Sequence, residues 1–197
     1  MTGASSIAAG YTHSMALKDN RAWAWGDNSS GQTNVPVSAR SDVAEIAGGG
    51  TFSLARKTDN SVVAWGAGIV ATNVPGSLSI GVGNIAAGEN HALALKAGGI
   101  IAWGSNSFGQ CDVPAALTSG VSAISGGGYY SMALKDGGVQ IFGIPATNAL
   151  AYGIRDVPST ATSGVSAISA GRWHALALKN GGVIAWGATP TGETNSF

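Results

Sequence analysis

Apolar and polar positions alternate in short stretches along most of this chain, as in HSMALK at 13–18 and HALALK at 91–96. Such alternation is typical of β-strands, and no window of about 11 residues has the apolar spacing of an amphipathic helix. Asp136-Gly137 and Asn180-Gly181 each follow an alternating stretch, and these dipeptides favour tight hairpins because the turn needs positive φ. The pattern predicts an all-β protein built from hairpins.

The alternating stretches belong to an internal repeat. An isoleucine opens a small-residue segment five times, at steps of 39, 39, 39 and 44 residues: Ile7, Ile46, Ile85, Ile124 and Ile168. An aromatic residue followed by glycine comes 18 or 19 residues after each isoleucine: Trp25, Trp65, Trp103, Phe142 and Trp186. The octapeptide TSGVSAIS occurs at 118–125 and again at 162–169, at the joints between units. We therefore expect a single domain over 1–197, with repeats of about 7–45, 46–84, 85–123, 124–167 and 168–197.

Each unit is predicted to form four short antiparallel strands: the isoleucine segment, the alternating segment, the tryptophan segment and a short strand around QTNVP. Four strands in ~40 residues is the size of a propeller blade. The small residues of the isoleucine segment suit the crowded centre, so this strand is expected to be innermost. Five units predict a five-bladed β-propeller of four-stranded antiparallel blades.

The two ends of the chain suggest how such a ring would close. The segment ETNSF at 193–197 stands where the first unit has QTNVP. Because an open sheet edge is costly, we expect this strand to pair with the strand that begins at residues 4–10. The alternative is that the five repeats form part of a ring completed by another chain.

Charge and composition exclude several classes of partner. The chain has ten Lys and Arg and ten Asp and Glu, without a basic cluster, so no nucleic acid is expected to bind. One cysteine, Cys111, excludes an internal disulfide. The apolar runs are too short for a membrane helix, and the N-terminus lacks the features of a signal peptide. We expect no membrane insertion and a cytoplasmic or virion-associated location, unless a leader was removed.

Residues suited to catalysis or metal binding are scarce. His13, His91 and His174 share one repeat position, which Phe52 and Tyr130 fill in the other units, so packing and loop hydrogen bonding are expected. Separate blades would hold these histidines too far apart for zinc. No phosphate-binding loop, Ser-His-Asp spacing or acidic pair stands out. We expect no enzyme activity, no catalytic residue, no metal and no cofactor.

Two further positions have structural interpretations. A lysine ends the alternating stretch of every unit and is predicted to form a solvated rim: Lys18, Lys57, Lys96, Lys135 and Lys179. Cys111 stands where the first unit has Thr33 and is predicted to be a small strand residue. Arg56 replaces the leucine of its stretch, and the sequence gives no reason for the change.

The units differ most in the loop after the first strand and in the loop after the aromatic–glycine pair. Both loops are predicted to lie on the same side of the blades, and variation on a rigid scaffold is typical of a recognition face. Large amphipathic side chains in such loops are typical interface anchors. The candidate partner-binding residues are Tyr11, Thr12, Glu89, Asn90, Phe108, Tyr129, Tyr152, Arg172 and Trp173.

Two of the units also resemble a known family. IAAGYTHSMALK (7–18) with AWGDNSSGQTNVP (24–36), and IAAGENHALALK (85–96) with AWGSNSFGQCDVP (102–114), resemble the regulator of chromosome condensation repeat family. The repeats are similar to those of the short-repeat bacterial branch, which includes a protein inhibitor of beta-lactamase. The resemblance implies a propeller, usually seven-bladed, and in that inhibitor aromatic loop residues grip the target enzyme. The eukaryotic namesake is an exchange factor for a small GTPase and binds chromatin, but the chain has neither its wedge nor a basic tail, so that activity is not expected.

These observations predict a non-catalytic β-propeller recognition module that binds a protein partner through variable loops on one face. One alternative is a structural or adhesion protein of a virion or cell surface. Another is a carbohydrate-binding, lectin-like propeller. A lectin with one site per blade needs similar polar and aromatic residues in every blade, whereas these loops differ between units. The identity of the partner and the oligomeric state stay open.

Overall fold

The computed structural model describes residues 2–67, 69–144 and 153–187. Its strands form five antiparallel sheets of three consecutive strands each. The strands are β1 (Ser6–Ala9), β2 (His13–Lys18), β3 (Arg21–Gly26), β4 (Val43–Gly48), β5 (Phe52–Lys57), β6 (Val62–Gly66), β7 (Val82–Ala87), β8 (His91–Lys96), β9 (Gly99–Gly104), β10 (Val121–Gly126), β11 (Tyr130–Lys135), β12 (Gly138–Gly143), β13 (Val165–Ala170), β14 (His174–Lys179) and β15 (Gly182–Gly187). The short helix α1 (Ile69–Thr72) follows β6, and 3₁₀ turns occur at Val37–Ala39, Gly76–Leu78, Ala115–Leu117 and Ser159–Ala161.

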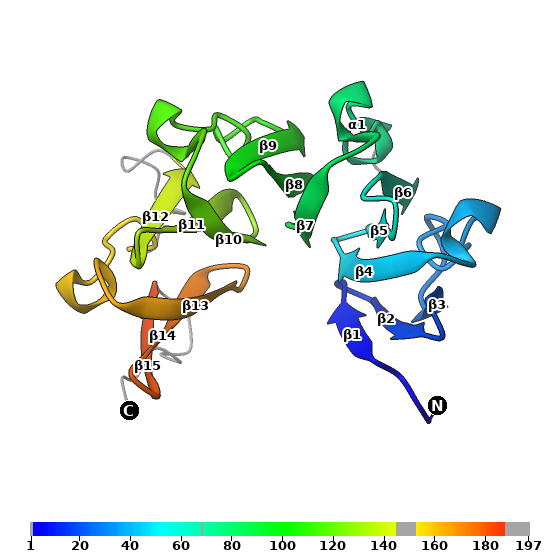
Figure 1. Cartoon of the computed structure of the whole chain (residues 1–197), viewed down its shortest axis with the longest axis horizontal. Coiled ribbons are helices and arrows are strands. Elements are labelled where there is room, and N and C mark those ends of the chain that lie inside the picture. The colour runs from blue at the N-terminus through cyan, green and yellow to red at the C-terminus, as the bar shows by residue number, and fades with distance from the viewer. Residues whose placement is uncertain (1, 68, 145–152, 188–197) are drawn as a thin grey trace.

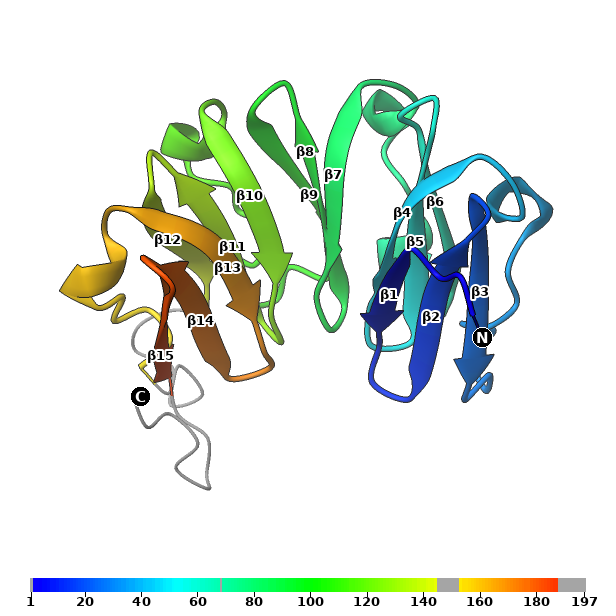
Figure 2. The same cartoon turned by 60° about the horizontal axis from the view of Figure 1, so that its bottom comes forward.

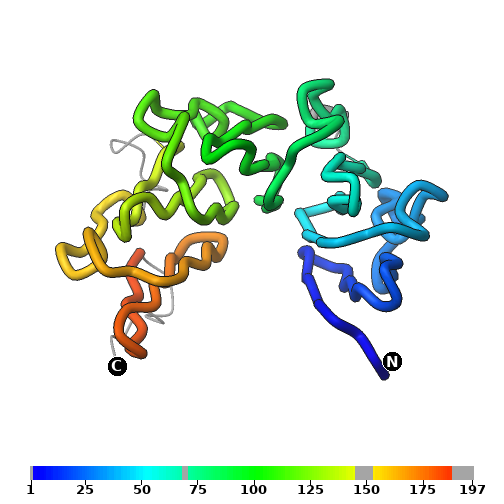
Figure 3. Tube along the Cα trace, in the orientation of Figure 1, coloured from blue at the N-terminus to red at the C-terminus, as the bar shows by residue number. Residues whose placement is uncertain are grey.

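The five sheets are arranged like blades around a common centre (Figure 1). Successive first strands contact one another along the inside, as β4 does with β7 and β7 with β10. The first strand is therefore innermost, as the small residues predicted. The trace forms an open arc, with the first and fifth blades at its two ends (Figure 3).

The prediction of four-stranded blades in a closed ring is wrong, because each sheet has three strands. The segment expected to form the fourth strand turns instead into a 3₁₀ helix that begins after the proline of the Val-Pro pair. Proline has no backbone N–H to add to a ladder, and its fixed φ, −68° at Pro36, suits the start of a helical turn. Among the described residues no strand joins one sheet to another, and the expected closing strand at 193–197 lies outside them.

In the second to fifth blades, the lysine that ends the second strand holds the preceding 3₁₀ turn in place. Lys57 Nζ donates a hydrogen bond of 2.8 Å to the carbonyl of Ser38, which lies in the turn before its own blade. Lys96, Lys135 and Lys179 make the same contact with Ser77, Ala116 and Thr160. The predicted solvated rim is thus also a tether between the joint and the blade.

Within the arc, the face of a blade that packs on the following blade is called its trailing face, and the face that packs on the preceding blade is called its leading face. At the first junction Met15 and Leu17 of the trailing face form a cluster with Val43, Ile46 and Trp65 of the next leading face. The other junctions repeat this arrangement of leucine or methionine against valine, isoleucine and a large aromatic ring. Burial on both faces explains why the strands are apolar on both sides.

The histidine position confirms the predicted packing role and extends it across the junctions. His13 Nε2 lies 2.9 Å from Ser53 Oγ in the next blade. Ser53 Oγ in turn donates to the Gln32 carbonyl at 2.9 Å, so Nε2 is the donor to the serine. Burial lowers the pKa of the His13 ring, which favours its neutral form. His91, Ser131 and Gln110 form the same chain at the third junction.

Two units have phenylalanine or tyrosine at the histidine position, and the next blade then has alanine in place of the serine. Phe52 shares a core cluster with Ala92, and Tyr130 shares one with Ala175. The residue pair at each junction is therefore matched in polarity: histidine with serine, and phenylalanine or tyrosine with alanine.

Arg56, which the sequence left unexplained, belongs to a polar network at the second junction. Its Nε lies 2.9 Å from Glu45 Oε2, and its Nη1 donates to Asn60 Oδ1 at 2.9 Å. The other Glu45 oxygen accepts a hydrogen bond from Asn84 of the next blade. The fourth unit has alanine and leucine at the positions of Glu45 and Arg56, so an ion pair replaces an apolar contact.

We expect Arg56→Leu alone to destabilise the protein by about 1–2 kcal/mol, because Glu45 keeps its half-buried charge without a cation. Glu45→Ala together with Arg56→Leu copies the pair in the fourth unit, Ala123 and Leu134, and should recover most of the loss. Urea denaturation of both variants measures the difference. A double variant no more stable than Arg56→Leu would contradict this account.

Candidate functional site

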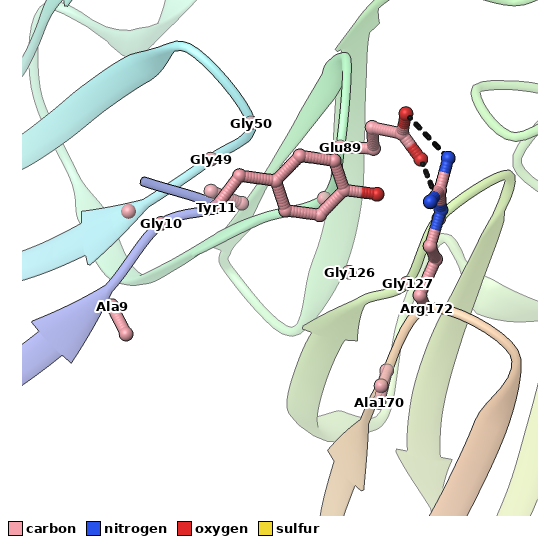
Figure 4. A pocket seen from close by; sticks show the side chains of 15 residues that line it. Ala9, Gly10, Tyr11, Gly49, Gly50, Glu89, Gly126, Gly127, Ala170 and Arg172 are labelled. Atoms are coloured by element: carbon pink, nitrogen blue, oxygen red, sulfur yellow. Dashed lines mark hydrogen bonds and ion pairs between the residues drawn. The ribbon is translucent and has the colours of Figure 1, made fainter. Parts of the chain in front are cut away.

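The loops between the first and second strands converge at the centre of the arc. They all lie on one side of the blades, and the 3₁₀ turns lie towards the opposite side (Figure 2). The loops surround a cavity of about 160 Å³, lined by the small residues that end each first strand and by Tyr11, Glu89 and Arg172 (Figure 4).

Backbone hydrogen bonds tie these loops to one another. Gly50 N donates to Glu89 O at 2.9 Å, Glu89 N to Gly127 O at 3.0 Å, and Gly128 N to Arg172 O at 3.2 Å. A Cβ at Gly50 would lie 2.4 Å from Glu89 O, so the close approach requires glycine. The floor of the site is therefore a rigid strip of backbone running from the second to the fifth repeat.

Above this floor, side chains from three repeats meet. Arg172 Nε and Nη2 bond the two carboxylate oxygens of Glu89 at 3.2 and 3.3 Å, and its guanidinium lies 5.2 Å from the centre of the Tyr11 ring. Tyr11 points across the cavity towards this ion pair (Figure 4). Burial, followed by the hydrogen bond and charge of Glu89, raises the pKa of the Tyr11 hydroxyl, so Tyr11 is neutral at physiological pH.

A row of aromatic rings continues from Arg172. Its guanidinium lies 5.3 Å from the Trp173 ring, Trp173 packs edge-on to Tyr129 at 5.3 Å, and Tyr129 lies 4.6 Å from Phe108. The last three rings are partly exposed. The residues of this surface, called the mouth cluster below, are Tyr11, Glu89, Phe108, Tyr129, Arg172 and Trp173.

The structure thus brings together six of the nine predicted site residues. Thr12 and Asn90 instead support the neighbouring loops, since their carbonyls accept from Asp27 N and Ser105 N at 2.9 and 2.8 Å. Tyr152 lies outside the described residues. The glycine floor was missed, although the glycine that recurs after every first strand was its signal.

The surroundings of Cys111 hold its thiol in the protonated form. Cys111 lies in the loop after β9 rather than in the expected strand, and its Sγ donates to the Ser105 carbonyl at 3.3 Å. Burial and the nearby Asp112 raise the pKa of its thiol to about 11, which keeps it protonated at neutral pH. Within the described part of the chain no three His, Cys, Asp or Glu side chains gather as metal ligands, and no helix could cross a membrane.

A family model matches two segments of the chain. Residues 4–32 and 84–110 match the model of the Regulator of chromosome condensation (RCC1) repeat. Among curated proteins, no sequence matches the chain.

Several solved structures share the fold. They include the CRINKLY WD40 ectodomain of the Arabidopsis thaliana receptor kinase ACR4 (TM-score 0.70, 20% identity, covering 97% of this chain and 65% of that one). Prp20p from Saccharomyces cerevisiae, studied for its binding to Gsp1p and histones, gives a TM-score of 0.74 at 20% identity, covering 96% of this chain and 58% of that one. Human WBSCR16 gives 0.70 at 21% identity, covering 92% and 61%. The chain therefore spans less than two thirds of the length of these propellers.

Proposed function

We propose that this chain, which carries regulator of chromosome condensation repeats, is a non-catalytic recognition module that binds a protein partner through the mouth cluster. The observation that carries the proposal is the row from Phe108 through Tyr129 and Trp173 to Arg172. Tryptophan, tyrosine and arginine are the residue types that dominate binding energy at protein interfaces. The structurally similar Prp20p is itself a protein with protein ligands, which favours the same class of function.

The side chains of the mouth cluster are also arranged to bind with little loss of conformational entropy. The loops that carry Glu89, Tyr129 and Arg172 are tied together by the backbone hydrogen bonds between Gly50 and Arg172. Each ring contacts another ring or the guanidinium, and Glu89 fixes that guanidinium through two oxygens. A surface ordered before binding loses less conformational entropy when the partner arrives.

The asymmetry of the cluster favours a protein over a repeated sugar site. The third, fourth and fifth repeats supply the aromatic row, whereas the second repeat contributes Gly50 and Thr51 at the corresponding position. The result is one surface with unequal contributions rather than five equal pockets. This supports a single macromolecular partner.

The test compares Tyr129→Ala/Trp173→Ala with Val37→Ala/Ile80→Ala, which removes two exposed apolar side chains from the 3₁₀ turn and the joint. Wild type and variants are immobilised, exposed to extract from the source organism, and the retained proteins are identified by mass spectrometry. We expect a retained protein that the control pair still binds and the mouth pair loses. In a direct titration Trp173→Ala should weaken binding about 30-fold, close to 2 kcal/mol.

Equal retention by all three proteins would contradict the proposal. Binding on a glycan array that survives the mouth substitutions would point instead to a carbohydrate site elsewhere.

A further inference from the structure

The loops that follow β3 and β9 share one pattern of hydrogen bonds. In the first of them the Asn28 side chain accepts from Thr33 N at 3.0 Å, and in the other Asn106 accepts from Cys111 N at 2.8 Å. In both, the glutamine side-chain oxygen accepts from the amide two residues earlier at 2.9 Å. The first loop, DNSSGQ at 27–32, and the third loop, SNSFGQ at 105–110, can therefore be compared position by position.

The residue that opens the first loop is Asp27, whose carboxylate is surrounded by donors. Its oxygens accept four hydrogen bonds. The donors are Thr12 Oγ1 at 3.2 Å, Ser29 N at 3.2 Å, Ser29 Oγ at 2.9 Å and Gln32 Nε2 at 2.8 Å. These bonds, above all those from Ser29, lower the pKa of Asp27, so this set of donors favours a charged carboxylate.

The third loop keeps polar donors at these positions but has no carboxylate to match them. Ser105 stands at the position of Asp27. The donor positions hold Asn90, Ser107 and Gln110. Gln110 is fully buried, and its Nε2 has no hydrogen-bond partner in the part of the chain that the structure describes. Because a buried N–H without an acceptor is unfavourable, an acceptor that reaches it gains free energy.

The acidic residues close to the third loop are engaged elsewhere. Asp112 accepts a hydrogen bond from Asn106 Nδ2 at 2.7 Å, and Glu89 bonds Arg172 through both of its oxygens. Neither carboxylate accepts from Gln110 Nε2. The described residues thus supply no acceptor for this amide.

The position lies beside the mouth cluster and can be reached from outside. Asp27 is exposed in the first loop, and Asn90 and Ser107 are exposed in the third. Phe108, which begins the aromatic row, follows Ser107 directly, and its backbone N donates to Gln110 Oε1 at 2.9 Å. A partner residue that contacts Phe108 therefore places its neighbour close to these donors.

We propose that the third loop binds a carboxylate of the protein partner, an aspartate or glutamate side chain, at the place that Asp27 fills in the first loop. Gln110 Nε2, Ser107 N and Ser107 Oγ donate to it, and the Asn90 side-chain amide is the fourth donor. An apolar residue next to this carboxylate in the partner packs on Phe108. The inference rests on the proposed function for the source of the carboxylate, and it adds the charge that the partner presents beside the mouth cluster.

Titration with sodium acetate, a simple carboxylate, tests the third loop without the partner. In wild type the side-chain amide resonances of Gln110 should shift with acetate, and not with sodium chloride at the same ionic strength. Ser105→Asp supplies a carboxylate from the chain itself, so these resonances should become insensitive to acetate and the urea midpoint should rise. Asp27→Ser makes the opposite change, and the Gln32 amide should then respond to acetate.

The protein retained from extract through the mouth cluster tests the role of the partner. It should bind Ser105→Asp at least about tenfold more weakly than wild type, because two carboxylates would then face each other. Ser105→Ala is the matched control, since it adds no charge and leaves every donor in place, and should bind like wild type.

The outcomes separate this inference from the proposed function. Gln110 resonances that acetate does not shift, or a retained protein that binds Ser105→Asp like wild type, overturn the inference and leave the proposed function standing. If the mouth cluster retains no protein, the proposed function fails and the partner carboxylate fails with it, whereas the acetate titration still decides whether the third loop binds carboxylates.

Discussion

Gly88→Ala is expected to destabilise the protein by about 3 kcal/mol, because the added methyl group would overlap atoms of two neighbouring segments. A Cβ at Gly88 would lie 2.1 Å from Cε1 of His91 and 2.6 Å from the Gly127 carbonyl. The His91 ring is fully buried and held by Ser131, so it has no room to move away. The same glycine precedes an aromatic ring by three residues in every unit, with clashes between 2.1 and 2.3 Å. This steric need explains why the glycine recurs five times.

Gly76→Ala is the matched control, because a Cβ there would meet no atom within 4 Å. The change should leave stability unaltered within about 0.5 kcal/mol, or raise it slightly by restricting the unfolded chain. Guanidinium denaturation of both variants gives the comparison. Equal losses from the two substitutions would show that the ring contact does not explain the repeated glycine.

The second large effect is a loss of stability in acid caused by His91. Burial lowers the pKa of its imidazole to about 4, from an ordinary value of 6.5. The folded state therefore binds fewer protons than the unfolded state between these two values, and stability falls as the pH falls through that window. The expected loss from this one residue is about 3 kcal/mol by pH 4. Burial lowers the pKa of His13 as well, which acts in the same direction.

His91→Tyr with Ser131→Ala is the variant that tests this cause. The double change copies the junction of Tyr130 with Ala175. It removes the titrating ring, and it also removes the serine that would otherwise lose its hydrogen-bond partner. Urea midpoints measured between pH 7 and pH 4 should decline less steeply than those of wild type. The same decline in both proteins would place the acid sensitivity elsewhere in the chain.

Most of the fold could be predicted because the same pattern of strands and turns recurs five times along the chain. Alternating strands, hairpin dipeptides and the spacing of isoleucine and tryptophan gave the three strands of each blade and their order from the centre outwards. The prediction of a fourth strand was wrong because the valine of QTNVP suits a strand, whereas the following proline begins a 3₁₀ turn. In that loop the Gln32 side chain bonds Ser30 N and Asp27, contacts that no strand pattern reveals.

The candidate site could be predicted as a set of loops but not as a surface. Differences between units selected Arg172 and Tyr129, yet the meeting of Arg172 with Glu89 depends on loops 83 residues apart. Arg56 was unexplained for a similar reason, since Glu45 and Asn84 lie on other strands. Contacts between repeats follow from how closely the blades approach, and glycines such as Gly50 set that distance without a side chain of their own.

The central claim, that loops from opposite ends of the chain form one surface, is tested most directly by crosslinking residues 11 and 172. Tyr11→Cys and Arg172→Cys are introduced together in a Cys111→Ser background and treated with a short bismaleimide, and the mass of the product separates links within a chain from links between chains. The account predicts a rapid link within one chain, and none when Tyr11→Cys is replaced by Val37→Cys on the opposite side. Failure of the 11–172 pair to link within the monomer, or equal linking of the control pair, would contradict it.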